Sequence, residues 1–227
     1  MTTLHPDLAP DWIRPAMGLD VAKTRRRMGV RASESTAPTK REAAVLVLLK
    51  GSAADDAEVL LTHRSPTMRS HSGQIAFPGG RRDPEDINVV DTALREAWEE
   101  TGLQRGTVTP LEQWGQLRVR SSSAPVSPVL AYWHQPGEVY PASLEETDDV
   151  FTTPIAELAA PENRLQIAWG NWTGPAFTVN DYLVWGFTGG ILSALLEHAG
   201  WERNWDNNSV VDLRDALAAS KNNEKMG

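Results

Sequence analysis

The chain has 227 residues, of which 41% are hydrophobic, and a formal net charge of −8. This length fits one large domain or one domain with extensions, and the charge argues against indiscriminate binding to DNA or RNA, which depends on Lys and Arg neutralising phosphates. The sequence contains no cysteine, which excludes disulfides, thiolate catalysis and zinc–thiolate sites. Because no apolar stretch is long enough to span a bilayer and no secretory signal is present, we expect a soluble, cytoplasmic protein that binds neither nucleic acid nor membrane.

Three segments are expected along the chain. Residues 1–40 contain four prolines and a polar run, and are predicted to form a partly ordered N-terminal extension. Its basic segment Arg25–Arg27 could bind a partner, although a solvated arm is the preferred interpretation. Residues 41–200 are predicted to form the main domain, and residues 201–227 a polar tail with a short helix.

The main domain begins with a predicted hairpin. Ala43–Leu49 is a continuous apolar run typical of a buried strand, and Glu58–Thr62 is its expected partner. Arg64–Gly80 is rich in proline and glycine, which predicts a loop. Val89–Thr101 has apolar residues at helical spacing and is followed by Gly102, which predicts a helix. The remaining predicted elements, which together indicate a mixed α/β fold, are strands over residues 111–119, 126–133, 165–169, 176–179 and 182–185 and helices over residues 154–158, 191–198 and 210–217.

Three carboxylates share one turn of the predicted helix. Residues three and four apart are neighbours on a helix, so Glu96, Glu99 and Glu100 project from the same side. Like charges this close repel one another, and a divalent cation among them makes the arrangement favourable, since Mg²⁺ prefers oxygen ligands and commonly acts with phosphates. On spacing alone, the alternative is a solvated acidic turn in which Arg95 pairs with Glu99.

The segment Gly80–Leu103 resembles the Nudix box of the Nudix hydrolases. That box is a glycine, five residues, an acid, seven residues and then Arg-Glu-apolar-x-Glu-Glu-x-Gly-apolar. The chain departs from it twice, because Asp86 stands where the box has Glu and eight residues rather than seven separate it from Arg95. The matching positions are Gly80, Asp86, Arg95, Glu96, Ala97, Glu99, Glu100, Gly102 and Leu103.

Two further segments, Leu60–Gly80 and Tyr182–Ile191, are similar to parts of the coenzyme A pyrophosphatase branch, which tolerates the longer spacing. The resemblance implies a Nudix-type α/β/α sandwich with a mixed sheet. It implies a pyrophosphohydrolase that cleaves coenzyme A or its derivatives into 3′,5′-ADP and 4′-phosphopantetheine, or its acyl form. Water activated by Mg²⁺ or Mn²⁺ would be the nucleophile, and a homodimer is compatible with the resemblance.

The resemblance also implies roles for single residues. Glu96 and Glu100 are predicted to be the primary metal ligands, and Glu99 to contribute to the metal or to the activation of water. Arg95 is the fourth member of the predicted catalytic set. We expect it to hold the helix and the loop together rather than to contact the substrate. Arginine pairs bidentately with phosphate, and glycines let the backbone approach closely. The residues predicted to bind or shape the substrate site are Arg64, Arg69, His71, Gly79 and Gly80.

The sequence also suggests roles for three other residues. Asp86 is expected to cap or orient its loop, and Phe77 to lie in the core. Glu146 could be a remote general base, but a solvated loop carboxylate is the preferred interpretation.

Two rival functions stay open. The first is a Nudix hydrolase acting on another nucleoside diphosphate derivative, such as ADP-ribose or a dinucleotide, because the box alone serves all of these. The second is a nucleotide-sensing domain that has lost catalysis, against which the presence of all three glutamates speaks.

Overall fold

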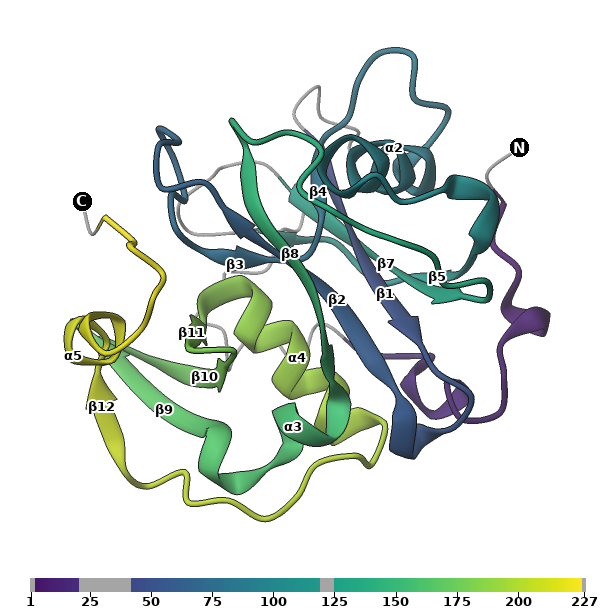
Figure 1. Cartoon of the computed structure of the whole chain (residues 1–227). Coiled ribbons are helices and arrows are strands. Elements are labelled where there is room, and N and C mark those ends of the chain that lie inside the picture. Colours follow the sequence, from purple (N-terminus) through teal and green to yellow (C-terminus); the bar gives the residue numbers. More distant parts are fainter. Residues whose placement is uncertain (1–2, 21–41, 119–124, 226–227) are drawn as a thin grey trace.

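A computed structural model describes residues 3–20, 42–118 and 125–225. The larger sheet is mixed, with the strand order β3-β2-β1-β7-β5, and three further strands pair with its members: β4 with β1, β6 with β7 and β8 with β2 (Figure 1). Strands β1 and β7 run parallel, whereas β1 and β2 form the antiparallel hairpin that the sequence predicts. The strands of this larger sheet are β1 (Ala43–Lys50), β2 (Glu58–Arg64), β3 (Ile75–Ala76), β4 (Gly79–Arg81), β5 (Val108–Gln113), β6 (Leu117–Arg118), β7 (Pro125–Trp133) and β8 (Thr147–Pro154).

Helices and a second sheet cover the two faces of the larger sheet. Helix α2 (Val89–Thr101) packs on one face against β1 and β4. Helix α4 (Gly186–His198) lies on the other side and packs against β10 of the second sheet (Figure 1). The fold is therefore mixed α/β, as predicted. The second sheet, in the order β11-β10-β9-β12, contains β9 (Arg164–Trp169), β10 (Trp172–Val179), β11 (Tyr182–Val184) and β12 (Val210–Asp212), and the short helices are α3 (Ile155–Ala159) and α5 (Leu213–Ala218).

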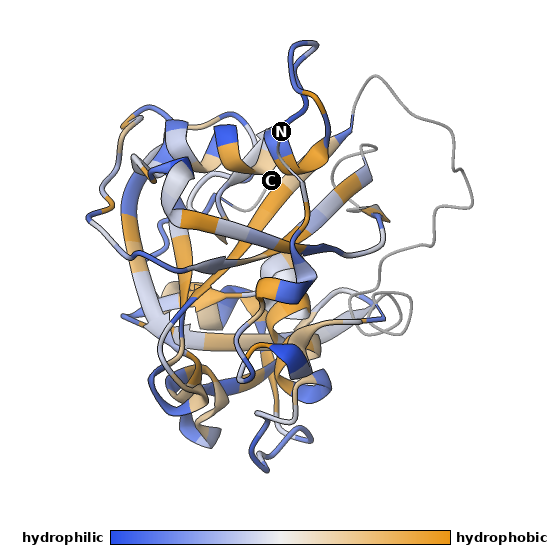
Figure 2. Ribbon diagram, turned by 90° about the vertical axis from the view of Figure 1, so that its right-hand side faces the viewer, coloured by the Kyte–Doolittle hydropathy of each residue, from blue (hydrophilic) through white to orange (hydrophobic). Residues whose placement is uncertain are grey.

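Burial on both faces explains the uninterrupted apolar run of β1. Successive side chains of a strand point to opposite faces. Leu46 and Leu48 pack in the cluster that includes Ala93 of α2, whereas Val47 and Leu49 join the cluster that includes Leu192 of α4. Figure 2 shows hydrophobic residues concentrated along the inner strands and polar residues around the outer loops.

Helix α2 has the bounds that the sequence predicts, because both of its ends carry strong signals. The Asn88 side chain accepts hydrogen bonds from the backbone N–H groups of Val90 and Asp91, which caps the first turn. Gly102 adopts a left-handed conformation (φ 69°) and its N–H donates to the Trp98 carbonyl, which ends the helix. The three glutamates therefore lie in the last two turns of a well-defined helix.

Several predicted elements need correction. Helix α4 begins at Gly186 rather than residue 191, and α3 begins at Ile155 with Pro154 as its N-cap. The segment 210–217 starts as the strand β12 before it becomes α5, and 111–119 contains the end of β5 and the separate β6. Strand β8 was not predicted, because Asp148 and Asp149 obscure its β-branched residues.

The N-terminal residues 3–20 pack against the domain. Ile13 and Ala16 are completely buried in the cluster that also contains α4 residues. Arg25–Arg27 lie outside the described residues, so the interpretation of that segment stays a prediction, as do the predicted boundaries at residues 40 and 200. None of the helices in the described parts of the chain is long and apolar enough to cross a membrane.

Candidate active site

The candidate site lies where β4 passes beneath α2. Gly79 pairs with Val45 of β1, and its N–H donates to Glu100 Oε2 over 3.0 Å. A β-carbon built on Gly80 would lie 2.4 Å from Glu96 Oε2, so only glycine leaves room for that carboxylate. The two glycines therefore let the strand approach the glutamates of the helix closely, and one of them donates a backbone hydrogen bond.

Glu100 is a buried carboxylate, and Glu96 is partly buried, with its side chain 14% exposed. Glu100 is 2% exposed, and burial raises its pKa to about 8, although nearby Arg64 and the Gly79 N–H act to lower it. Burial also raises the pKa of Glu96, against the opposing effect of Arg95. Burial penalises the charged form of a carboxylate. These two side chains thus lie in surroundings that an additional positive charge would stabilise.

Arg95 and Asp86 hold the loop to the helix. The Arg95 guanidinium donates to both Asp86 carboxylate oxygens over 2.9 Å and to the Arg81 carbonyl over 2.8 Å. Asp86 also accepts from the Asp83 N–H and from the Thr92 hydroxyl, which agrees with its expected role in orienting the loop. Bracing is therefore the role of Arg95 that these contacts support.

Glu99 occupies the outer side of the same turn. Its side chain is 45% exposed, and Oε2 accepts from Arg95 Nη1 over 2.9 Å. The Arg95–Glu99 ion pair of the alternative interpretation is therefore present, and Arg95 Nη1 also lies 3.1 Å from Oε1 of partly buried Glu96.

Glu146 immediately precedes β8, beside the end of β2. Its negative charge contributes to raising the pKa of both Glu96 and Glu100, and the residue is exposed. Its backbone carbonyl accepts from the Ser65 N–H over 2.9 Å. The sequence favoured a solvated loop carboxylate here. The missed signal is the β-branched and aromatic run at 150–153, which marks β8 and pairs with residues 59–62 of β2, so that Thr147 faces Arg64 at the end of β2.

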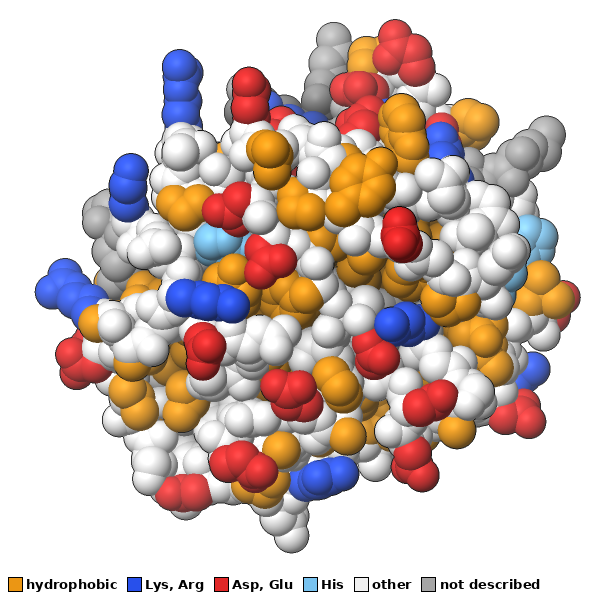
Figure 3. All heavy atoms as spheres, in the orientation of Figure 1, with side chains coloured by type: hydrophobic (Ala, Val, Ile, Leu, Met, Phe, Trp, Pro, Cys, Tyr) orange, Lys and Arg blue, Asp and Glu red, His pale blue; other side chains and the backbone are white. Residues whose placement is uncertain are grey.

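The predicted substrate-binding residues divide into two groups. Arg64 lies inside the site, with Nη1 3.7 Å from Glu100 Oε1, whereas Arg69 is exposed on the loop between β2 and β3. His71 is half-buried on that loop and Nδ1 lies 2.9 Å from Gln74 Oε1. Phe77 is 2% exposed within the core, as predicted. Figure 3 shows acidic side chains gathered at the top of the molecule, over the loop that precedes α2.

Comparison with known proteins identifies the family. A family model described as the NUDIX domain matches residues 39–170, which is more than half of the chain. The chain belongs to the Nudix hydrolases. The Nudix hydrolase NudL of Photorhabdus laumondii is 32% identical over 154 residues, which cover 61% of this chain and 75% of NudL. The reaction class is therefore hydrolysis of a phosphoric anhydride, and the family typically depends on a divalent metal.

Another relative has a more specific name. The mitochondrial coenzyme A diphosphatase NUDT8 of Homo sapiens is 38% identical over 151 residues, and the match spans 61% of each chain, which is less than two thirds of NUDT8. Among solved structures, a Nudix hydrolase from M. smegmatis, RenU, is 23% identical, with a TM-score of 0.45 over 57% of this chain and 81% of RenU.

The donor set of this Nudix site fits a hard divalent cation. Among residues 3–20, 42–118 and 125–225, no group of three or more acidic, His or Cys side chains is already gathered around one point. Mg²⁺, however, is commonly held by one or two carboxylates together with waters and substrate phosphates. Glu96 and Glu100 supply two carboxylates, and the lack of a side chain at Gly80 leaves room for the carboxylate of Glu96. The residues present therefore fit a hard divalent cation that is also held by waters and substrate phosphates better than a metal that needs a complete protein cage.

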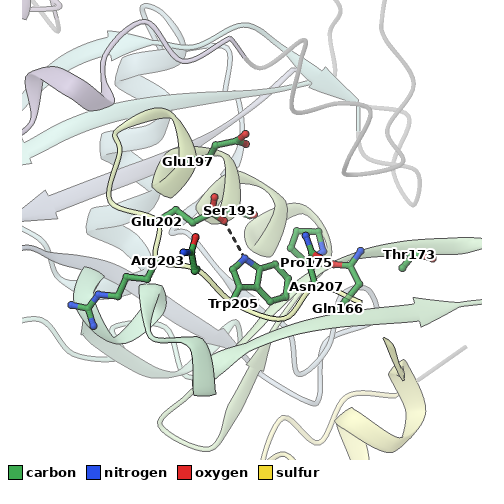
Figure 4. A pocket seen from close by; sticks show the side chains of 10 residues that line it. Gln166, Thr173, Pro175, Ser193, Glu197, Glu202, Arg203, Trp205 and Asn207 are labelled. Atoms are coloured by element: carbon green, nitrogen blue, oxygen red, sulfur yellow. Dashed lines mark hydrogen bonds between the residues drawn. The ribbon is translucent and has the colours of Figure 1, made fainter. Parts of the chain in front are cut away.

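A cavity of about 540 Å³ lies elsewhere, beside the second sheet (Figure 4). Its wall includes Trp205, whose indole N–H donates to Glu202 Oε1 over 3.2 Å. Buried Arg164 donates to the same carboxylate oxygen, and its Cζ lies 4.4 Å from the Trp205 ring centroid and 4.7 Å from the Phe177 ring centroid. None of the residues lining this cavity belongs to the Nudix box, so it is separate from the candidate site.

Proposed function

We propose that this Nudix domain hydrolyses the diphosphate of coenzyme A or of a derivative, releasing 3′,5′-ADP and 4′-phosphopantetheine or its acyl form. The observation that carries the proposal is that buried Glu100 and partly buried Glu96 lie together against the Gly79–Gly80 strand, with the Arg64 guanidinium 3.7 Å from Glu100 Oε1. The similarity to a protein named as a coenzyme A diphosphatase supports the choice of substrate class.

The chain's own groups divide the work of the reaction. The oxygen of a water attacks one phosphorus, the bond from that phosphorus to the bridging oxygen breaks, and the bridging oxygen leaves with the other phosphate. Glu96 and Glu100 would hold Mg²⁺ or Mn²⁺, which supplies charge neutralisation and activates water when bound. Arg64 would pair with a phosphate oxygen in a site where burial strengthens the interaction.

Two carboxylates are candidates for the base that removes the water proton. Glu99 and Glu146 are both exposed, so both can reach water. Glu99, however, is engaged by Arg95. Glu146 is the better candidate because its backbone accepts from the Ser65 N–H, next to Arg64, and its charge contributes to the raised pKa of both Glu96 and Glu100.

The loop between β2 and β3 would contact the adenosine half of the substrate. Arg69 is exposed there and is the candidate partner of the 3′-phosphate, while His71 would shape the loop. Gly79 and Gly80 would keep the backbone close to the diphosphate. A cytoplasmic location and a homodimer stay predictions of the sequence.

Steady-state hydrolysis of a substrate panel with and without Mg²⁺ or Mn²⁺ tests the proposal. Coenzyme A, an acyl derivative, ADP-ribose and a dinucleotide should be compared at equal concentration, and coenzyme A forms should be cleaved fastest. Glu100→Gln should reduce turnover by about 10²-fold or more, since it removes a group placed to act in the transition state. Glu162→Gln, an exposed change outside the site, is the matched control.

Each rival has its own outcome. Much faster cleavage of ADP-ribose than of coenzyme A would overturn the substrate assignment and leave the Nudix reaction in place. Equal turnover by wild type and Glu100→Gln would overturn the metal assignment. Binding of these nucleotides without metal-dependent hydrolysis would identify a nucleotide-sensing domain.

A further inference from the structure

Strands β2 and β8 pair with a β-bulge beside the candidate site. His63 faces Asp149 and the next residue, Arg64, faces Thr147, so Asp148 is the extra residue of the bulge. A bulge bends its strand and re-aims neighbouring side chains, and bulges are common next to active sites. This bulge lies between the regular part of β8 and Glu146. The conformation of Asp148 therefore sets the direction in which Glu146 leaves the sheet.

His63 fastens this bulge from the opposite strand. Its side chain is 4% exposed, and Nδ1 lies 2.5 Å from Asp148 Oδ1. The other ring nitrogen, Nε2, lies 2.9 Å from the carbonyl oxygen of Asn222. Both partners are acceptors, so both bonds form together only when each ring nitrogen carries a hydrogen. The Tyr182 ring stacks on the imidazole at 4.7 Å and its hydroxyl donates to Asp149, which restricts His63 further.

The second partner of His63 belongs to a C-terminal strap, defined as Lys221–Glu224. Asn222 is completely buried, and its amide bonds to both the N–H and the carbonyl of Leu183 in β11, over 2.8 and 3.0 Å. The Glu224 carboxylate accepts from Gln74 Nε2 over 2.6 Å and from Trp185 Nε1 over 2.9 Å. The strap thus joins the second sheet to the loop between β2 and β3.

The loop is shaped to receive the strap. Gly73 has φ +75°, and a β-carbon there would lie 2.4 Å from the Asn222 carbonyl oxygen and 2.8 Å from the Glu224 Cα. Backbone atoms cannot yield as a side chain can, so a larger residue would displace the strap. On the other side, the Arg64 N–H donates to the Gln74 carbonyl, which ties the loop to the residue that faces Glu100.

We propose that the C-terminal strap is a positioning element of the Nudix site, and that His63 is the positioning residue that connects it to the Asp148 bulge and so to Glu146. The contacts of the strap described here are with His63, Leu183, Gln74 and Trp185, and not with Glu96 or Glu100. The strap therefore acts on the site through the ends of β2 and β8. This inference rests on the proposed function only for the role of Glu146, because the mechanical connection is a property of the fold.

Kinetics of full-length variants test the connection. His63→Leu removes both imidazole bonds, and Asn222→Ala removes both bonds to Leu183. Each should lower kcat by roughly tenfold or more with KM within about twofold, because a small misplacement of a catalytic group is costly. Lys225→Ala, an exposed change beside the strap, is the control and should keep wild-type kcat. Wild-type kcat in both His63→Leu and Asn222→Ala would overturn the inference while leaving the proposed function standing.

Hydrogen exchange gives a second readout that needs no substrate. The Ser65 N–H bonds to the Glu146 carbonyl at the bulge, and it should exchange roughly tenfold faster in Asn222→Ala than in the wild type. Amides of α2 should keep their wild-type protection, which separates local release from general unfolding. Unchanged exchange at Ser65 would overturn the connection even if the protein hydrolysed none of the substrates in the panel.

Discussion

The carboxylate of Glu96 occupies the space that a side chain at Gly80 would need, since a β-carbon on Gly80 would lie 2.4 Å from Glu96 Oε2. The clash involves the far end of a side chain, which can rotate away, and not the backbone. A substitution at Gly80 should therefore alter the site more than the fold.

The variant Gly80→Ala makes this testable. We expect kcat to fall by about 10²-fold, because Glu96 must leave the position in which it meets the metal. The melting temperature should change little. Gly137→Ala is the matched control, since a β-carbon there meets nothing within 4 Å. Wild-type kcat in Gly80→Ala would argue against Glu96 as a ligand in its present position.

Asp86 should make stability depend on acid pH. Although burial acts to raise its pKa, hydrogen bonds from Arg95, the Asp83 N–H and Thr92 hold that pKa at about 2. Because the folded pKa lies below the unfolded value of about 4, the carboxylate stabilises the fold above pH 4 by about 2 kcal/mol. That contribution should be lost as the pH falls from about 4 to about 2.

Denaturant unfolding between pH 2 and pH 7 measures this effect. Asp86→Asn should be less stable than the wild type near neutral pH, and the difference should shrink toward pH 2. Glu85→Gln, an exposed neighbour on the same loop, should follow the wild-type curve. A constant difference between Asp86→Asn and wild type at all pH values would contradict the assignment.

The cap of α2 should contribute to stability and not to chemistry. Asn88→Ala removes the acceptor of two backbone N–H groups, so the free energy of unfolding should fall by about 1 kcal/mol. Activity at 25 °C should stay near the wild-type value, because the glutamates lie at the other end of the helix. Equilibrium unfolding in urea measures the change, with the exposed Asn204→Ala as control.

Glu146 and its neighbour Glu145 form a matched pair for testing the base. Both are exposed, and Glu146 contributes to the raised pKa of both Glu96 and Glu100. Glu146→Gln should lower kcat by about 10²-fold or more with little change in KM. Glu145→Gln should leave both constants unchanged. Equal kcat for the two variants would return Glu146 to the status of a solvated loop carboxylate.

Recognition of the 3′-phosphate should depend on Arg69. Loss of a charge-assisted hydrogen bond costs about 2 kcal/mol, so Arg69→Ala should raise KM for coenzyme A by roughly tenfold or more. The same variant should hydrolyse the analogue that lacks the 3′-phosphate as the wild type does. Arg214→Ala, an exposed arginine of α5, is the control. An equal rise in KM for both substrates would show that Arg69 does not read this phosphate.

Local signals in the sequence determined the parts of the fold that depend on neighbours in the chain. The apolar run of β1, the Asn88 cap and the Gly102 stop set two central elements, and helical spacing alone put the three glutamates on one turn. The family resemblance then supplied the reaction class, which no spacing rule contains.

Tertiary structure decided how deeply each of those glutamates is buried and which residues of other segments lie next to it. Only the crossing of β4 beneath α2 distinguishes Glu96 and Glu100, which lie against the glycines, from the more exposed Glu99. Glu146 lies 46 residues after Glu100 in the sequence, and Asn222 follows His63 by 159 residues. Pairing of β2 with β8 and docking of the C-terminal strap bring these groups together, because contacts between distant segments depend on packing and strand register, which local periodicity does not specify.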